Sequence, residues 1–471
     1  MPHIFVSYSK QNIDFVRYLR ALLENEGFTL WIDEARLTPS AKWWKAIEEN
    51  IESCGAFIVV MSPDAYESDW VEREILLAEK LKRPIFPVLL AGNPWSRLAN
   101  IQYEDMRLGL HARPSPHFLT RLHTILNTGA AGADRSIIFR IEYGDITSVE
   151  ADVAAFKYAN GFHGADRLVA ERLYNQGGIT FDQLEAKPNE YRLVETGGHI
   201  AASQVLYVGT PRIRHLGYKQ IREFAVRVLG SLAEAAPSMA HLVMTTHGPG
   251  FSLDETEAFL SQFAGFRDAM QAGDCPPALR QMTIVEINQE RVLRLRKLLD
   301  TTLAAADYAR PLEEGWGYKL SLPGSMGDAP EPAAIQNAGT KNIKPHAYVA
   351  IPAIPEMDDV FFFGIQAPIH ARGLLCEYVN PALFTADLIE QIKEHIETAS
   401  VVIADLTSAD PRVYLQVGYA WAKNRPTILL LKNNETALLP DSIPTLSYQR
   451  IKDLEMALAE RLDTFKLEGQ L

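Results

Sequence analysis

Short apolar runs alternate with longer amphipathic stretches over the first 128 residues of the chain. Four runs have the length and composition of buried strands: 4–9, 28–33, 56–61 and 84–90. Between them, apolar side chains recur at the spacing of one helix face, as in Phe15, Leu19 and Leu23 after the predicted helix cap Asn12. Strands and helices that alternate in this way predict a parallel sheet with helices on both faces.

The same alternation returns twice in the rest of the chain. The middle part contains predicted strands at 136–143, 204–208, 240–245 and 281–286, with helices at 218–236 and 255–270. The last part contains predicted strands at 346–352, 374–378, 400–407 and 427–431, with helices at 360–372, 386–399 and 413–423. A small-residue stretch at 129–133 and a Pro/Gly-rich stretch at 322–332 separate the three parts. At 471 residues the chain is too long for one core, and we predict three α/β domains, at 1–128, 136–305 and 343–460.

Composition narrows the classes of partner. The net charge of -13 does not favour nucleic acid, because a protein that binds phosphates through lysine and arginine normally has a basic face. The cysteines Cys54, Cys275 and Cys376 are far apart and form no CxxC or Cys/His cluster, so their spacing predicts neither a disulfide framework nor a zinc site. No apolar run is long enough to cross a bilayer, and the chain opens on a strand without a charged leader. We expect a soluble cytoplasmic protein with no metal and no membrane partner.

The most informative chemistry in the first part follows the apolar run 56–61. Residues 62–68 are predicted to form the loop at the carboxyl end of this strand, and the next helix begins near Trp70. Open parallel sheets bind ligands at that end. Trp70 and Glu74 are four residues apart on one helix face, where they offer an aromatic wall and a charge to one bound molecule. The alternative is that Glu74 is an ordinary first-turn glutamate, favoured by the helix dipole.

Four sequence boxes occur in order in the first part: Phe-Val-Ser-Tyr-Ser, Leu-Trp-Ile-Asp, Val-Val-Met-Ser-Pro and Trp70-Val-Glu-Arg-Glu74. Together they resemble a Toll/interleukin-1 receptor (TIR) domain, which implies a flavodoxin-like parallel sheet. In enzymatic TIR domains the glutamate of the W-x-x-x-E box is the catalytic residue for cleaving nicotinamide from NAD, and it corresponds to Glu74. The resemblance implies that NAD binds against Tyr8, Ser9, Asp33, Trp43 and Trp70. The loop after Asp33 departs from the family, which often has a glycine after a proline where this chain has Pro39-Ser40.

The implied chemistry needs little besides one carboxylate. Breaking the bond between ribose C1 and the pyridinium nitrogen of NAD leaves an oxocarbenium-like centre, which a nearby carboxylate stabilises. Nicotinamide departs as a neutral molecule, so the reaction needs neither a general acid nor a metal. NAD is therefore expected as the substrate, and no cofactor is expected.

Short motifs of the middle part are Gly-Asp145-Ile-Thr, Ala-Asn160-Gly and the glycine loop at 246–251. They are similar to those of a macro domain. In that family the aspartate of Gly-Asp-Ile-Thr and a late glycine loop bind ADP-ribose, which would be a product of NAD cleavage. The resemblance implies ligand contacts at Asp145, Asn160, Gly248 and Gly250. The alternative is that these glycine loops are plain turns.

The last part contains Val-Ile-Ala-Asp405-Leu-Thr and Pro-Arg412-Val-Tyr-Leu-Gln416-Val-Gly. These motifs resemble the nucleoside 2-deoxyribosyltransferase-like family, whose members carry a glutamate nucleophile at the position of Gln416 and an asparagine at that of Arg412. An amide cannot form the glycosyl ester that a carboxylate forms, so a pocket without its nucleophile is implied. We expect Asp405 and Gln416 to contact a nucleotide-type ligand there. The alternative is a domain kept for packing or assembly.

One leading hypothesis and two alternatives follow. The resemblance implies an NAD glycohydrolase of bacterial-type antiviral defence, which cleaves NAD to nicotinamide and ADP-ribose or a cyclic form. Such an enzyme is expected to assemble through its TIR domain as a homo-oligomer or filament, and to be activated by that assembly or by a nucleotide-type ligand. The first alternative is a non-catalytic TIR signalling scaffold with nucleotide-sensing C-terminal domains, which the altered loop at Ser40 favours. The second places the enzyme in the C-terminal domain, and Gln416 argues against it.

Overall fold

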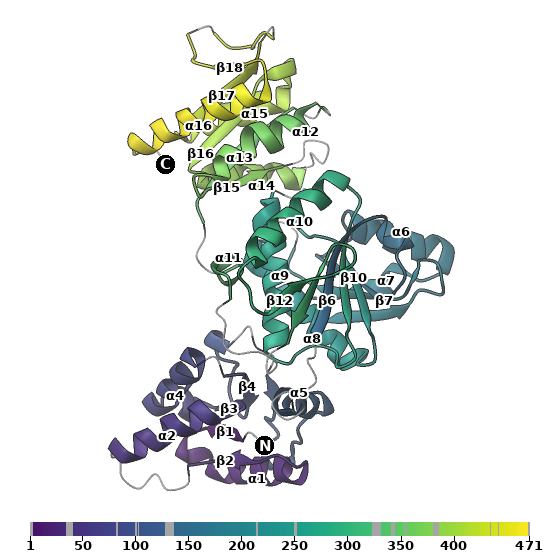
Figure 1. Cartoon of the computed structure of the whole chain (residues 1–471), viewed down its shortest axis with the longest axis vertical. Helices are drawn as coiled ribbons and strands as arrows, with labels where there is room; N and C mark the ends of the chain where they lie inside the picture. Colours follow the sequence, from purple (N-terminus) through teal and green to yellow (C-terminus); the bar gives the residue numbers. More distant parts are fainter. Residues whose placement is uncertain are drawn as a thin grey trace.

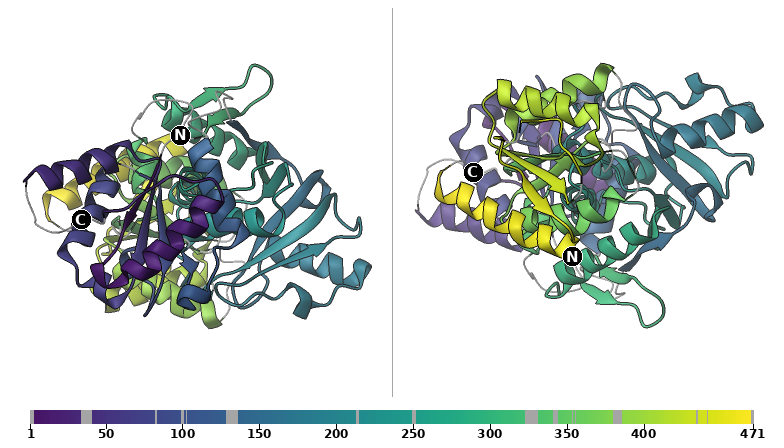
Figure 2. Two further views of the ribbon diagram at one scale, coloured as in Figure 1. Left: turned by 90° about the horizontal axis from the view of Figure 1, so that it is seen from below. Right: turned by 90° about the horizontal axis from the view of Figure 1, so that it is seen from above.

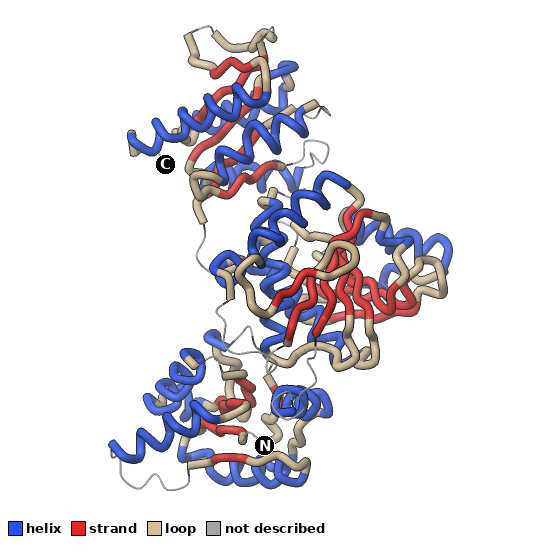
Figure 3. The backbone as a smooth tube through the Cα atoms, in the orientation of Figure 1, coloured by secondary structure: helices blue, strands red, loops and turns tan. Residues whose placement is uncertain are grey.

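A computed structural model gives the fold of the chain. It describes residues 3–33, 41–81, 83–98, 101, 103–127, 136–212, 215–248, 252–322, 331–340, 344–352, 354, 356–379, 386–433, 435–440 and 442–469. Three separate sheets form an N-terminal, a middle and a C-terminal unit, which follow one another along the long axis (Figure 1, Figure 3). Helices and mainly parallel strands build each unit, which confirms the predicted α/β class. Within the described ranges, no helix has the length and apolar character needed to cross a membrane.

The N-terminal unit is a five-stranded parallel sheet in the order β2-β1-β3-β4-β5. Its strands are β1 (Ile4–Ser7), β2 (Leu30–Trp31), β3 (Ala56–Met61), β4 (Ile85–Leu89) and β5 (Glu104–Asp105). Its α-helices are α1 (Ile13–Asn25), α2 (Ala41–Ser53), α3 (Pro63–Tyr66), α4 (Asp69–Lys80) and α5 (Pro116–Asn127). Successive strand residues point to opposite faces, so the sheet has two cores: one packs against α1 and α5, the other against α2 and α4.

The structure corrects one prediction in part and excludes one alternative for this unit. Asn12 is the N-cap residue of α1 as predicted, but its side-chain oxygen makes no capping bond and accepts a hydrogen bond from Ser62 Oγ at 2.7 Å, which ties the start of the helix to the end of β3. Glu74 is not in the first turn of α4, because the helix begins at Asp69 and its first-turn acids are Asp69 and Glu72. The helix dipole acts mainly on the first turn, so it does not explain Glu74.

The middle unit is an eight-stranded sheet in the order β12-β13-β6-β11-β10-β7-β9-β8. Its strands are β6 (Ser136–Tyr143), β7 (Ala151–Tyr158), β8 (Tyr191–Glu195), β9 (Ala202–Gly209), β10 (His241–Met244), β11 (Gln281–Glu286), β12 (Ala309–Pro311) and β13 (Tyr318–Ser321). Strands β6, β11, β10, β7 and β9 run parallel, and the outer strands β8, β13 and β12 pair antiparallel. Its helices include α6 (Ala165–Gly177), α7 (Phe181–Leu184), α8 (Tyr218–Ala235), α9 (Glu255–Gln271) and α10 (Gln289–Leu303).

The C-terminal unit repeats the topology of the first, with five parallel strands in the order β15-β14-β16-β17-β18. They are β14 (His346–Ala350), β15 (Leu375–Tyr378), β16 (Val401–Asp405), β17 (Thr427–Lys432) and β18 (Leu446–Tyr448). One face packs against α16 (Ile451–Leu467), α13 (Ala367–His370) and the π-helical segment η6 (Val360–Gln366), which follows α12 (Met357–Asp359). The other face packs against α14 (Ala386–Thr398) and α15 (Pro411–Ala422). The short α11 (Ala333–Asn337) precedes this unit in sequence.

Residues at the two ends of α9 contact the neighbouring units. At its N-terminal end, Asp254 Oδ2 lies 2.5 Å from His370 Nε2 of the C-terminal unit. Just past its C-terminal end, Asp274 Oδ1 lies 3.7 Å from Arg121 Nε of α5, and both side chains are buried. Views along the long axis show that the part of the middle unit with α6 and α7 projects to one side of the other two units (Figure 2). Helix α9, together with the residues that flank it, therefore lies between contacts with the N-terminal and the C-terminal units.

Candidate functional site

Glu74 lies where α4 meets the carboxyl end of β1. Its carboxylate accepts a hydrogen bond at 2.5 Å from the hydroxyl of Ser7, the last residue of β1. Both side chains are fully buried, with 0% of their surface exposed. Val71 and Ile75 pack the same side of α4 into the core, which fixes the carboxylate over the sheet. A buried carboxylate needs such a donor, because an unpaired charge is costly away from water.

Ser7 marks the position where sheets of this topology bind ligands. In the order β2-β1-β3-β4-β5, the direction of winding changes between β1 and β3. Ser7 is in register with Val59 of β3, so the ends of these two strands lie side by side. Open α/β sheets bind ligands at the carboxyl ends of the strands next to such a switch point. The Glu74 carboxylate therefore lies at the edge of the sheet where a ligand is expected.

Three of the other residues predicted to bind NAD directly follow β1 and β2, and a fourth, Trp70, lies on the same helix as Glu74. Tyr8 is buried, and its hydroxyl donates to the backbone oxygen of Asp33 at 2.9 Å. The Asp33 side chain is 7% exposed. The buried Ser9 donates its hydroxyl proton to the side chain of Gln11. Trp70 is half-buried in the first turn of α4, one turn before the glutamate.

Part of the predicted site lies outside the described residues. This applies to the loop with Pro39 and Ser40, and to the side chain of Trp43, whose backbone belongs to the first turn of α2. The described part places Tyr8 and Asp33 in direct contact, and Glu74 of α4 in contact with Ser7, the residue before Tyr8. Because Glu74 has no exposed surface, a substrate reaches its carboxylate only after the groups above it move.

The predicted ligand residues of the middle unit share one edge of its sheet. Asp145 follows β6, Asn160 follows β7 and Gly248 follows β10, and these strands run parallel. Asp145 is exposed and accepts hydrogen bonds from the amide and the hydroxyl of Thr147, both at 2.9 Å, so it caps the turn after β6. Asn160 is exposed with a φ of 57°, a conformation that asparagine adopts readily in turns. Gly250 lies outside the described residues.

Gly248 is required by packing as well as by its backbone. Its φ is 109°, and a Cβ atom there would lie 2.9 Å from Ile221 and 3.1 Å from Ala258. A larger side chain would strain the backbone at this φ and would require the Ile221 side chain and Ala258 to shift. This geometry accounts for the glycine without a ligand.

Buried ionisable groups lie behind this edge. Lys157 at the end of β7 pairs with Asp166 of α6, and burial raises the pKa of Asp166. His247 meets the ring of Phe224 edge-on, with the ring centres 4.9 Å apart. Burial lowers the pKa of His247 far below its ordinary value, so its imidazole is neutral at neutral pH.

The two predicted ligand residues of the C-terminal unit have separate partners. Asp405 ends β16, and its carboxylate accepts from the Thr407 amide at 2.9 Å and the Tyr448 hydroxyl at 2.7 Å. Burial raises the pKa of Asp405. On α15, the side-chain oxygen of Gln416 accepts from the Tyr348 hydroxyl at 2.8 Å, and its amide donates to a backbone oxygen one turn earlier at 3.0 Å. Both groups are buried, so a ligand would have to compete with these bonds.

A match to a known sequence family identifies the first unit. Residues 4–122 match the family described as "TIR domain". The N-terminal unit is a TIR domain. The match runs from β1 into α5, and the middle and C-terminal units lie outside it. No protein with a curated description matches the chain.

Several solved structures are similar to parts of the chain. The TIR domain of a Toll-related receptor from Hydra magnipapillata is 21% identical over 22% of this chain and 82% of its own, with a TM-score of 0.20. A Trypanosoma brucei macrodomain solved with ADP-ribose is 12% identical over 34% of this chain and 68% of its own, with a TM-score of 0.27. A CMP N-glycosidase from Clostridium botulinum is 20% identical over 23% of this chain and 80% of its own, with a TM-score of 0.16.

Sequence reasoning missed the direct partners of the candidate residues. In the TIR domain, Ser7 contacts Glu74 across 67 positions of sequence, and in the C-terminal unit Tyr348 contacts Gln416 across 68. The signal for Ser7 was its place in the Phe-Val-Ser-Tyr-Ser box at a strand end. Tyr348 lies inside an apolar strand pattern, which marks it only as a core residue.

Proposed function

We propose that this chain is an NAD glycohydrolase and that Glu74 of its TIR domain is the catalytic residue. The observation that carries the proposal is the Glu74 carboxylate, held by Ser7 at 2.5 Å beside the switch point between β1 and β3. TIR domains as a family include NAD-cleaving enzymes and signalling scaffolds, so the family match supports both classes. The Trp70 and Glu74 pair on α4 supports the enzyme.

The proposed reaction breaks the bond between ribose C1 and the pyridinium nitrogen of NAD. The bonding electrons leave with nicotinamide, which becomes neutral, and C1 becomes an oxocarbenium-like centre. The negative charge of Glu74 stabilises that centre, and the Ser7 hydrogen bond keeps the carboxylate in one orientation. Water then adds to C1 and loses a proton to solvent, which gives ADP-ribose. Attack by a group of the same molecule in place of water gives a cyclic product.

We also propose that the competent state of the TIR domain is minor until assembly or a nucleotide-type ligand stabilises it. Support comes from the complete burial of Glu74 and from the segment around α9, where Asp274 contacts the TIR domain and Asp254 contacts the C-terminal unit. Asp145, Asn160 and Gly248 in the middle unit, and Asp405 and Gln416 in the C-terminal unit, are the proposed ligand contacts. Such latency suits a cytoplasmic effector of bacterial-type antiviral defence, because unregulated loss of NAD would harm the cell that makes it.

A non-catalytic signalling scaffold is the second candidate function. The observation that favours it is the 0% exposure of Glu74, because a carboxylate that never opens to substrate serves only the fold. In this case the TIR domain binds other TIR domains and the remaining units regulate that assembly.

The two candidates differ in one measurement. Purified full-length protein is incubated with NAD, and nicotinamide, ADP-ribose and cyclic products are separated by liquid chromatography. The enzyme hypothesis predicts nicotinamide release that depends on Glu74. The scaffold hypothesis predicts assembly into oligomers with no nicotinamide above the level of a protein-free control.

A further inference from the structure

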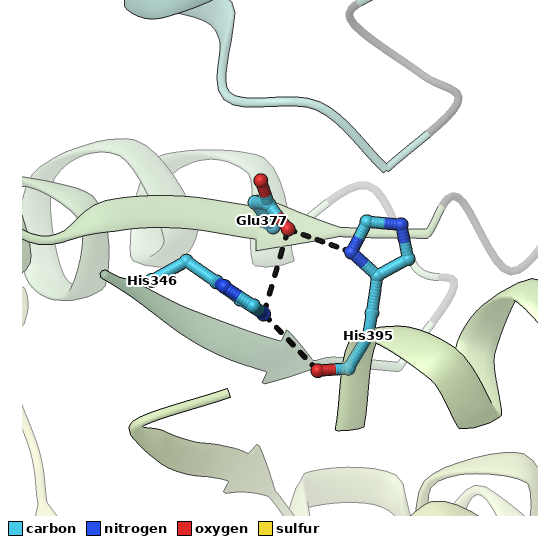
Figure 4. Close-up of side chains that lie close together, drawn as sticks. All are labelled: His346, Glu377 and His395. Carbon is cyan, nitrogen blue, oxygen red and sulfur yellow. Dashed lines mark hydrogen bonds and ion pairs between the residues drawn. The ribbon is translucent and has the colours of Figure 1, made fainter. Parts of the chain in front are cut away.

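A buried glutamate lies between two histidines where the C-terminal unit meets the middle unit (Figure 4). His346 begins β14, Glu377 lies in β15, and His395 lies in α14. Glu377 Oε2 is 2.6 Å from His395 Nδ1 and 3.6 Å from His346 Nε2. One donor atom from each residue lies within 4.8 Å of the other two. None of these residues belongs to the TIR site or to the ligand contacts proposed above.

The donor set suits a transition-metal ion of the zinc class. Two imidazole nitrogens and one carboxylate oxygen are ligands that zinc commonly takes, with bonds of about 2.0–2.2 Å and a fourth position left for water. Tetrahedral bonds of that length place ligand atoms roughly 3.3 Å apart. The contact between Glu377 and His346 already has nearly that separation, at 3.6 Å. The contact between Glu377 and His395 must open from 2.6 Å by roughly 0.7 Å, which a small side-chain rotation provides.

A second layer of contacts orients two of the three donors. The other carboxylate oxygen of Glu377 accepts from the Tyr218 hydroxyl at 2.7 Å. The other ring nitrogen of His395 lies 2.8 Å from Ser252 Oγ, which also accepts from Gln391 at 2.7 Å. Contacts of this kind fix the ring orientation and tautomer of metal-binding histidines. Tyr218 and Ser252 belong to the middle unit, so the layer around the donors spans two units.

We propose that His346, Glu377 and His395 form a binding site for one zinc-class divalent ion, with Tyr218 and Ser252 of the middle unit as its outer contacts. Binding of the ion then stabilises the docking of the C-terminal unit on the middle unit, because the second layer is complete only when the two are in contact. The cysteine spacing that argued against a zinc site in the sequence does not bear on this one, which uses no cysteine. The proposal does not depend on NAD cleavage by the TIR domain.

The competing explanation is a network of hydrogen bonds alone. Glu377 accepts from His395 and from Tyr218, and His346 Nε2 lies 3.0 Å from the backbone oxygen of His395. These bonds already satisfy much of the hydrogen-bonding capacity of the cluster. An ion must therefore bind strongly enough to replace the bond between Glu377 and His395 and the bond between His346 and the backbone oxygen. Direct titration measures that affinity.

The test uses the full-length protein, treated with a chelator, dialysed and titrated with Zn²⁺ by calorimetry, with bound zinc counted by elemental analysis. We expect one zinc ion per chain. Glu377→Gln keeps the shape of the side chain but lowers its donor strength, and His346→Gln removes a ligand, so each should weaken binding by at least 100-fold. Tyr218→Phe removes an outer contact and should weaken it by about 10-fold. His111→Gln changes an exposed histidine of the TIR domain and should bind as the wild type does.

Circular dichroism of each variant separates loss of binding from loss of fold. The proposal is overturned if folded wild type binds no zinc, which leaves the hydrogen-bond network as the full explanation. It is also overturned if Glu377→Gln and His346→Gln bind zinc as tightly as the wild type does. An unfolded Glu377→Gln shifts the decision to Tyr218→Phe, whose unchanged affinity in a folded protein would contradict the proposed outer contact.

Discussion

Replacing Glu74 tests whether its carboxylate is buried and bound as the structure has it. A glutamate that only met the helix dipole would contribute about 1 kcal/mol or less to stability. The buried contact with Ser7 predicts a larger effect for Glu74→Ala. That change removes the acceptor of a buried hydroxyl, which costs about 1–3 kcal/mol, and leaves a cavity, so we expect a total of about 2–4 kcal/mol.

Glu74→Gln separates the hydrogen bond from the charge. Its amide oxygen still accepts from Ser7, and its volume is nearly unchanged. Hydrogen bonds to charged groups contribute about 1.5–3 kcal/mol and those between neutral groups about 0.5–1.5 kcal/mol, so the expected loss is about 1 kcal/mol. Urea unfolding of both variants, followed by tryptophan fluorescence and circular dichroism, measures these differences.

Glu72→Gln is the matched control, because Glu72 lies on the same helix with its side chain 65% exposed. It should unfold at nearly the wild-type urea concentration. The reasoning is refuted if Glu74→Ala is as stable as the wild type or more stable. That result would mean that the cost of burying the carboxylate cancels or exceeds what the Ser7 bond contributes.

Three further predictions concern the other two units. Burial keeps His247 neutral in the folded protein, whereas the unfolded chain binds a proton below about pH 6.5. The free energy of unfolding should therefore fall by up to about 1.4 kcal/mol per pH unit below that pH, and calorimetry of His247→Phe should lack this contribution to the pH dependence. Asp166→Ala leaves the buried Lys157 ammonium without its carboxylate and should lower the free energy of unfolding by about 3–5 kcal/mol. The double variant Asp166→Leu with Lys157→Met should lose far less in thermal unfolding, and equal losses would contradict the buried pair. In the wild type the Gln416 amide donates a hydrogen bond to the Arg412 backbone oxygen, and Gln416→Glu turns a carboxylate oxygen toward that acceptor. The C-terminal unit should lose about 1–3 kcal/mol of stability, and an unchanged melting temperature would show that this amide is not held as described.

The sequence predicted the sheets best where a strand is continuously apolar. Runs such as 56–61 and 401–405 are buried strands because both faces of a parallel sheet are covered, and such runs need no partner to be recognised. Strand β7 (Ala151–Tyr158) was missed because it mixes alanine, aspartate and lysine. The buried Lys157 is stabilised there by its ion pair with Asp166. Outer strands such as β8 (Tyr191–Glu195) are half-exposed and carry a weak apolar signal.

The candidate sites were predictable only as far as local spacing goes. The four-residue interval in α4 marked Glu74, but its burial and its bond to Ser7 depend on how the helix packs on β1. Asparagine is a residue type that commonly caps helices, yet the side chain of Asn12 binds Ser62 at the end of β3 instead of the helix backbone. The cluster of His346, Glu377 and His395 comes from three elements and arises from the pairing of β14 with β15 and the packing of α14. No short-range pattern contains that information.

Nicotinamide release from NAD, measured side by side for wild type, Glu74→Gln and Glu72→Gln over a wide range of protein concentration, tests the central proposal most directly. The account predicts that wild type and Glu72→Gln release nicotinamide with a specific activity that rises with concentration or with an added nucleotide. Glu74→Gln should remain folded and release at least 100-fold less, which corresponds to about 2.7 kcal/mol of lost transition-state stabilisation. Equal release by Glu74→Gln and wild type would contradict the account.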